Sequence, residues 1–265
     1  MTLHRKDDLL WLSFPKFDSY KWLKNGFSTR FGGVSKGHLA SLNLDFRRGA
    51  DENAVRTNYE RIAAAIGFQT EDLVFAHQTH KANVLKVGRK DRGAGFLREV
   101  PWRDIDGLIT DEPGVVLTVL AADCLSVYLV DPDHQAIGLV HSGWRGTEAG
   151  IAANAVRAMQ EAYGSEPSSM YAAIGPSICQ DCYEVGEEVA IHFPNCYVIG
   201  KGGGKYLLDL QGTNRGILAE AGIPVDHISL PNLCTCCNPD LFYSHRAAGP
   251  HRGELAAFLG ILGPS

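Results

Sequence analysis

Residues 115–144 read VVLTVLAADCLSVYLVDPDHQAIGLVHSGW, and this stretch decides the fold class. Apolar and β-branched residues dominate segments 115–121, 125–130 and 136–140, which predicts three buried strands. The turn residues Asp131-Pro132-Asp133-His134 join the last two segments, so we expect these to be adjacent antiparallel strands. The middle third of the chain is therefore predicted to form the core of a β-sheet.

Helix-like and strand-like segments intermix on both sides of this core. Apolar spacing predicts a helix over about residues 51–66, with Asp51 as its N-cap and Gly67 as its C-terminal cap. No internal repeat or long linker interrupts the pattern, which predicts a single α+β domain over residues 1–265. The other predicted elements are a helix that begins after Thr147 and stops at Gly164, helices at 186–193 and 212–221, strands at 72–75, 84–87 and 107–110, and an irregular segment at 93–104.

The composition excludes some classes of protein. With 25 Lys or Arg, 30 Asp or Glu, a formal charge of −5 and no basic run, the chain is not expected to bind nucleic acid. No apolar run reaches the roughly 20 residues of a membrane helix, and the N-terminus lacks a signal core, so we expect a cytoplasmic protein without a membrane partner. Seven cysteines without a secretion signal favour thiols, metal ligands or a nucleophile over disulfides.

Three residues that are distant in sequence form the candidate site. Asp123-Cys124 interrupts two apolar strands, and the strand that follows ends in His141. The predicted antiparallel pairing brings Cys124 and His141 together, and His80 is the third candidate. One Cys and two His suit a zinc ion whose fourth position stays open for water or substrate. We expect Asp123 to orient a ligand or to act in proton transfer.

Several other interpretations fit the same residues. A lone Cys between strands is usually a small buried apolar group, and a lone His is usually a hydrogen-bonded core or surface residue. A metal-free hydrolase would use Cys124 as nucleophile and His141 as base, with Asp123 or His80 in support. A zinc site in a binding protein can be purely structural. A multicopper oxidase is disfavoured because its His-x-His pairs occur nowhere among the ten histidines.

Eight motifs occur in the order of the YfiH-type laccase-domain family, and the resemblance covers nearly the whole chain. The family was first named for multicopper polyphenol oxidation and is now associated with zinc-dependent purine nucleoside phosphorolysis and adenosine deamination. One bacterial branch is linked to the editing of peptidoglycan precursors. An amide of such a precursor would be the substrate of the metal-free hydrolase. The motifs are Phe27-Ser28-Thr29-Arg30-Phe31-Gly32-Gly33-Val34-Ser35, Ser41-Leu42-Asn43-Leu44, Gln78-Thr79-His80, Ala122-Asp123-Cys124, His141-Ser142-Gly143-Trp144-Arg145-Gly146, Ile174-Gly175-Pro176, Tyr183-Glu184-Val185 and Cys234-Thr235.

The resemblance implies a fold, a reaction and a set of site residues. The fold is a single domain of mixed β-sheets layered with helices, of the cytotoxic-necrotizing-factor/YfiH-like type. The reactions are phosphorolysis of adenosine, inosine, guanosine and methylthioadenosine, with adenosine deamination, so the partners are a nucleoside and phosphate. The metal ligands are His80, Cys124 and His141, which favours zinc over copper. Arg30 and Asn43 are expected to contact substrate or phosphate. The alternative is that Arg30 is a solvated loop residue and Asn43 is a turn former. Arg145 either binds an anion or caps carbonyl groups.

The C-terminal segment departs from the family pattern. An ungapped alignment puts Glu254 where the family has an arginine, although a slip of one or two residues would bring Arg252 there. Without an arginine at this place, phosphate binding is in doubt, and the balance moves toward hydrolysis or deamination.

The remaining cysteines include two Cys-x2-Cys pairs, Cys179 with Cys182 and Cys234 with Cys237. Such pairs suggest a four-thiolate zinc site if they meet in space. The gap between them is longer than in a zinc ribbon, and the resemblance places Cys182 and Cys234 in ordinary structural segments, so we do not expect a second site. Cys196 is expected to be a buried thiol.

Overall fold

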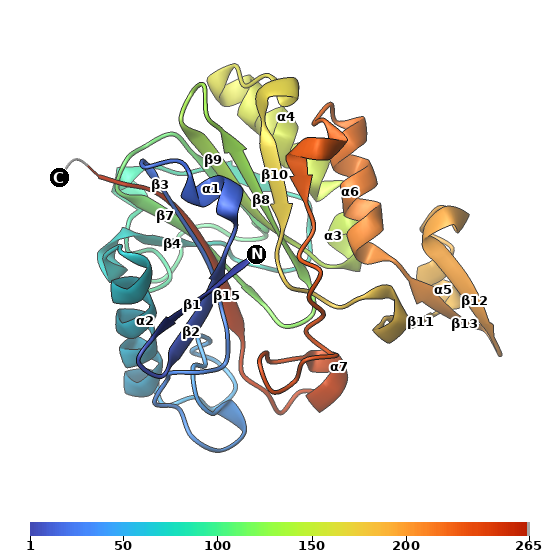
Figure 1. Cartoon of the computed structure of the whole chain (residues 1–265), viewed down its shortest axis with the longest axis horizontal. Coiled ribbons are helices and arrows are strands. Elements are labelled where there is room, and N and C mark those ends of the chain that lie inside the picture. Colours follow the sequence, from blue (N-terminus) through green and yellow to red (C-terminus); the bar gives the residue numbers. More distant parts are fainter. Residues whose placement is uncertain (264–265) are drawn as a thin grey trace.

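The computed structural model describes residues 1–263, which form two six-stranded sheets and one three-stranded sheet (Figure 1). The first sheet has the order β1 (Thr2–Lys6), β2 (Leu9–Ser13), β3 (Leu23–Ser28), β15 (Leu255–Ile261), β7 (Val115–Ala121), β4 (Leu73–Phe75). The second has the order β14 (Ile228–Ser229), β10 (Tyr171–Ile174), β8 (Leu125–Asp131), β9 (Ala136–Ser142), β6 (Gly107–Thr110), β5 (Val84–Lys86). The third has the order β11 (Glu184–Gly186), β13 (Lys205–Leu208), β12 (Val198–Gly202).

The main core lies between the two large sheets. Alternate residues of a strand point to opposite faces, and Leu117 and Val119 of β7 join Tyr128 and Val130 of β8 in this core. The intervening residues are also buried, because helices cover the outer faces. Val116, for example, packs in the cluster that contains helix α2. Burial on both faces explains why these strands read as continuous apolar runs.

Helices cover the outer face of each large sheet. Helix α2 (Glu52–Ile66) packs on the first sheet, while α4 (Ile151–Tyr163) and α6 (Leu210–Glu220) pack on the second (Figure 1). The Asp51 carboxylate accepts hydrogen bonds from the Asn53 and Ala54 amides and so caps α2. The result is a helix–sheet–sheet–helix layering. The short helices are α1 (Pro15–Asp18), α3 (Trp144–Glu148), α5 (Glu187–Ala190) and α7 (His245–Ala248).

The predicted mixture of sheets and helices is confirmed, with differences in detail. Helix α2 has the predicted bounds and caps, including Gly67 at φ 96°. The helix predicted after Thr147 is divided, because Gly150 adopts φ 72° between α3 and α4. Cys196 is exposed rather than buried, because it lies in a short surface turn before β12. Whether the chain is a single domain stays a prediction.

Among residues 1–263, no helix combines the length and the apolar character needed to cross a membrane.

Candidate active site

Cys124, His141 and His80 converge where strands of the second sheet end. Strands β8 and β9 pair antiparallel, with Ser126 opposite His141, so Cys124 lies just beyond the paired end. His80 enters from the loop after β4, and its ring centroid is 4.9 Å from that of His141. One ligand atom from each of the three residues lies within 4.8 Å of the other two. The predicted convergence is therefore present, and its spacing suits a single ion.

Asp106 holds the two histidines in position, and it was not among the predicted site residues. Its buried carboxylate accepts hydrogen bonds from His141 Nδ1 (2.9 Å) and from the backbone amide of His80 (3.0 Å). The amides of Thr79 and Lys81 donate to its other oxygen. A carboxylate on Nδ1 leaves Nε2 of His141 free for a metal, as is usual around histidine ligands. Its only sequence signal is an acidic residue directly before a buried strand.

The electrostatics of the site favour a cation. Burial alone would lower the pKa of His141, but Cys124 and Asp106 raise it to about 10. Partial burial and the nearby His141 lower the pKa of His80. Burial opposes ionisation of Asp106, but hydrogen bonds from His141, Thr79 and Lys81 hold its pKa below the usual range. The negative groups that retain a proton on His141 would equally stabilise a divalent ion at the same place.

Gly143 leaves room for the ligands. A Cβ atom placed there would lie 2.7 Å from His80 Nδ1 and 3.2 Å from Cys124 Sγ. Neither atom can move away without leaving the three-ligand arrangement. The glycine three residues later, Gly146, has no neighbour nearer than 3.4 Å to such an atom.

Replacing Gly143 with alanine is therefore expected to weaken the binding of a metal ion at this site at least about tenfold, since displaced ligands lose their geometry. Gly146→Ala is the matched control and should bind the ion like the unchanged protein, because it adds one methyl group without a clash. Competition with a chromogenic chelator measures both affinities. Equal affinities in the two variants would show that the space at Gly143 does not matter for metal binding.

An arginine-lined cavity of about 160 Å³ adjoins the three ligands. Arg47, Arg48 and Arg252 line it together with Glu254. Arg252 is only 7% exposed, and its Nη1 lies 2.6 Å from Glu254 Oε1. Its buried Nε has no hydrogen-bond partner within the protein. Asp45 is paired with Arg47 at 2.8 Å and with Arg48 at 3.6 Å, so three guanidinium groups face two carboxylates, and the remaining positive charge suits an anionic ligand.

Both candidate residues of the C-terminal segment lie in the wall of this cavity. Arg252 and Glu254 both line it, so an arginine is present there even though Glu254 occupies the ungapped position. Arg48 also contacts Glu254, at 3.3 Å. Arg47 and Arg48 were not among the predicted site residues. Their signal was a pair of adjacent arginines shortly after the Ser-Leu-Asn motif.

Three residues predicted to contact substrate do not line this cavity. Arg30 donates to the carbonyl oxygens of Ala40 and Pro239, and so ties two loops together. Asn43 is buried, and its Oδ1 accepts from the Glu254 amide at 3.0 Å, which positions the cavity wall. Arg145 is exposed, and its guanidinium lies 4.1 Å from the centroid of the Trp144 ring. Direct substrate contact by these residues stays a prediction.

Asp123 is turned toward a different set of partners. It has φ 85°, and its carboxylate oxygens accept from Thr235 Oγ1 and from the backbone amide of Arg246, each at 2.6 Å. It is not one of the three residues whose ligand atoms converge. The carboxylate ties the residue next to Cys124 to the segments that contain Thr235 and Arg246, and its proposed part in proton transfer stays a prediction.

The two Cys-x2-Cys pairs meet in space, contrary to expectation. One ligand atom from each of Cys179, Cys182, Cys234 and Cys237 lies within 4.8 Å of the other three. The pairing of strands β10 and β14 brings the two segments together despite the long sequence gap between them. The prediction that the pairs form no second site rested on that gap.

Comparisons with known proteins find relatives over nearly the whole chain. The family model described as multi-copper polyphenol oxidoreductase laccase matches residues 24–262. Purine nucleoside phosphorylase YlmD of Geobacillus stearothermophilus is 40% identical over 245 residues, which cover 89% of each chain. Adenosine deaminase RL5 of an unknown prokaryotic organism is 34% identical over 244 residues, 89% of this chain and 92% of the relative. The crystal structure of the hypothetical protein YfiH of Bacillus licheniformis superposes with a TM-score of 0.91, at 33% identity and 98% coverage of both chains.

Proposed function

Since this chain belongs to the multi-copper polyphenol oxidoreductase laccase family, we propose that it is a zinc-dependent purine nucleoside enzyme that performs phosphorolysis and deaminates adenosine. The observation that carries the proposal is a thiol and two imidazoles gathered beside an arginine-lined cavity. The names of relatives such as the phosphorylase YlmD and the deaminase RL5 support the two reactions.

The donor set favours zinc over several coppers. Within residues 1–263, His80, Cys124 and His141 form the only potential metal group that contains histidine. Oxidation by several coppers requires many imidazoles, whereas one thiolate and two imidazoles are a usual zinc set with an open position. A bound zinc ion would supply Lewis acidity and lower the pKa of water.

The residues around the cavity have different roles in the two reactions. Arg48 and Arg252 would bind phosphate by charge-assisted hydrogen bonds. Phosphate attack at the anomeric carbon breaks the bond to the purine nitrogen and gives ribose 1-phosphate and the protonated base. In deamination, water attacks the amino-bearing carbon of adenine, and inosine and ammonia result. Asp106 keeps His141 in place during both reactions.

Incubation of the purified, metal-analysed protein with adenosine or inosine, with and without phosphate, tests this proposal. We expect hypoxanthine from inosine only when phosphate is present, and inosine from adenosine in its absence, both read by chromatography. A heat-denatured sample and a chelator-treated sample reloaded with zinc are the controls. Failure to convert either nucleoside with one zinc bound at His80, Cys124 and His141 would refute the proposal.

Arg48→Gln is expected to raise the KM for phosphate about tenfold or more, since a hydrogen bond to a charged group contributes about 1.5–3 kcal/mol. Adenosine deamination should keep its rate, because that reaction needs no phosphate. Arg30→Gln is the comparison variant, since the Arg30 guanidinium binds backbone carbonyls outside the cavity. If Arg30→Gln raised this KM and Arg48→Gln did not, phosphate would bind at Arg30 instead.

A metal-free thiol hydrolase is the second candidate, and one contact favours it. A thiol, an imidazole and an orienting carboxylate lie in sequence at Cys124, His141 and Asp106. Asp106 takes the supporting role that we expected for Asp123 or His80. An amide of a peptidoglycan precursor would be its substrate. Turnover that survives chelation but is abolished by iodoacetamide would establish this mechanism and exclude the zinc enzyme.

A further inference from the structure

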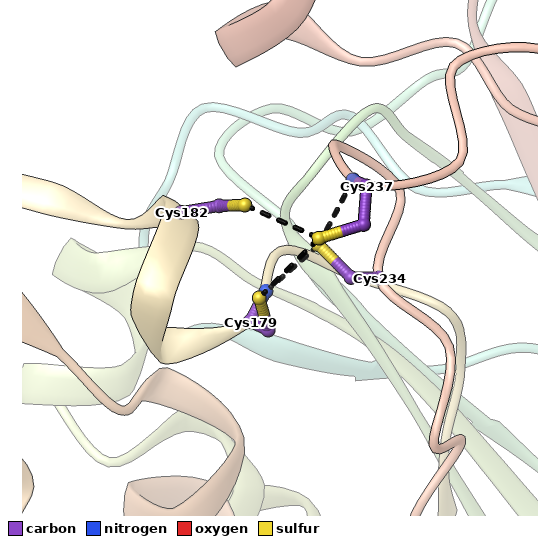
Figure 2. A group of neighbouring side chains, drawn as sticks. All are labelled: Cys179, Cys182, Cys234 and Cys237. Atoms are coloured by element: carbon purple, nitrogen blue, oxygen red, sulfur yellow. Dashed lines mark hydrogen bonds between the residues drawn. The ribbon is translucent and has the colours of Figure 1, made fainter.

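A second group of sulfur atoms lies outside the candidate active site. Cys179 and Cys182 follow strand β10, and Cys234 and Cys237 follow strand β14. These strands run parallel, with Ala172 opposite Ile228, and therefore deliver both segments to the same end of the sheet. An isolated parallel β-bridge also pairs Ser177 with Cys234. Figure 2 shows the four side chains turned toward one another from the two segments.

The separations match those of ligands around one ion. Four thiolates in a tetrahedron at a Zn–S distance of about 2.3 Å lie about 3.8 Å apart. Cys237 Sγ lies 3.9 Å from Cys179 Sγ and 3.4 Å from Cys182 Sγ, and every pair in the group lies within 4.8 Å. All four thiols are free, so the proximity does not come from disulfides. An iron–sulfur cluster would separate the cysteines further, because inorganic sulfur and several irons would lie between them.

Backbone groups are arranged to stabilise a thiolate. The amides of Cys179 and Cys237 point at Cys234 Sγ, at 3.3 and 3.4 Å (Figure 2). Hydrogen bonds to the charged form of a side chain favour that form. Four thiolates in such proximity repel one another unless a cation lies between them.

We propose that Cys179, Cys182, Cys234 and Cys237 bind one zinc ion as a closed structural site, separate from the site at His80, Cys124 and His141. Four thiolates fill every position of a tetrahedral ion, so no position remains open for water or substrate. Soft sulfur ligands select zinc over harder divalent ions such as magnesium or calcium.

The zinc ion would fasten two segments that support the active site. Thr235, between the cysteines of the second pair, donates to the Asp123 carboxylate, and the Ile178 amide donates to the Asp123 carbonyl at 3.0 Å. Arg246 Nη1 donates to the Cys182 carbonyl at 3.1 Å, while its amide donates to Asp123. Both segments therefore hold the residue next to Cys124, and the ion would cross-link them.

Zinc content per chain tests this proposal. Elemental analysis of the purified, reduced full-length protein should give two zinc ions, and Cys237→Ser should give one. Cys236→Ser is the matched control, because Cys236 is adjacent in sequence but not in the four-sulfur group, and it should keep two. The melting temperature should fall in Cys237→Ser only. Equal zinc content in the Cys236 and Cys237 variants would overturn the proposal, as would stoichiometric iron in place of zinc.

The Cys124→Ser variant keeps this test independent of the proposed nucleoside chemistry and of the folding of Cys237→Ser. It removes the thiol of the first site but leaves all four cysteines of the second, so one zinc ion should remain. Loading this variant with Co²⁺ should give intense near-ultraviolet thiolate-to-cobalt absorption. Loss of all zinc, or a cobalt form without this absorption, would overturn the four-thiolate site.

Discussion

Cys124→Ala is expected to lower turnover of nucleosides by about 1,000-fold or more, which is about 4 kcal/mol in the activation barrier. The variant removes the only thiol among the three converging ligands and leaves two imidazoles, too few to hold zinc firmly. Zinc at this site should be lost together with activity. Steady-state rates for adenosine and inosine, measured beside zinc content, check both statements. Cys196→Ala is the control, because that thiol is exposed and belongs to neither potential metal group.

A second substitution at the same position separates a metal ligand from a nucleophile. Cys124→Asp retains an anionic zinc ligand but removes the thiol. A zinc enzyme should keep some bound zinc and measurable activity in this variant, whereas a thiol hydrolase should lose all activity. Full activity in Cys124→Ala would contradict both mechanisms.

Asp106→Asn should reduce the free energy of unfolding by about 3 kcal/mol and weaken zinc binding about 10- to 100-fold. The carboxylate accepts from three backbone amides and from His141, and an amide group would place its own N–H donors against some of these. Urea unfolding and competition with a chelator measure the two effects.

Asp104→Asn is the matched control for this prediction. Asp104 lies two residues earlier, is exposed and accepts from the Thr79 hydroxyl, and its φ of 55° is one that asparagine tolerates. We expect both its stability and its zinc affinity to stay close to those of the unchanged protein. Similar losses in the two variants would mean that the Asp106 contacts with the histidines are not special.

Local patterns were sufficient to predict much of the fold. The apolar runs of β7, β8 and β9 identify themselves because both of their faces are buried, and the turn between β8 and β9 fixes their pairing. Strand β1 was not predicted, because four of its five residues are exposed and it carries charges, so no apolar pattern marks it. Burial helps to mark a strand in the sequence but is not sufficient, because β15 is fully buried and was not among the predicted strands.

The three converging ligands were predicted from the strand pattern and again from the resemblance, but the residues that surround them were not. The resemblance pointed to His80, Cys124 and His141, but Asp106 reaches His141 across 35 residues, and no local pattern records that hydrogen bond. Arg48 meets Glu254 across 206 residues for the same reason. These contacts depend on which strands become neighbours in a sheet, and chain spacing alone does not determine this.

Strand β15, near the end of the chain, occupies the centre of the first sheet between β3 and β7. On the ribosome, strands β1, β2 and β3 emerge long before this partner exists, so they must wait until residues 255–261 have been made before they can join β7. Arg252 and Glu254 directly precede β15 and complete the cavity wall only at that moment. A chain that has not yet reached β15 therefore lacks both a closed first sheet and the part of the cavity wall that Arg252 and Glu254 supply.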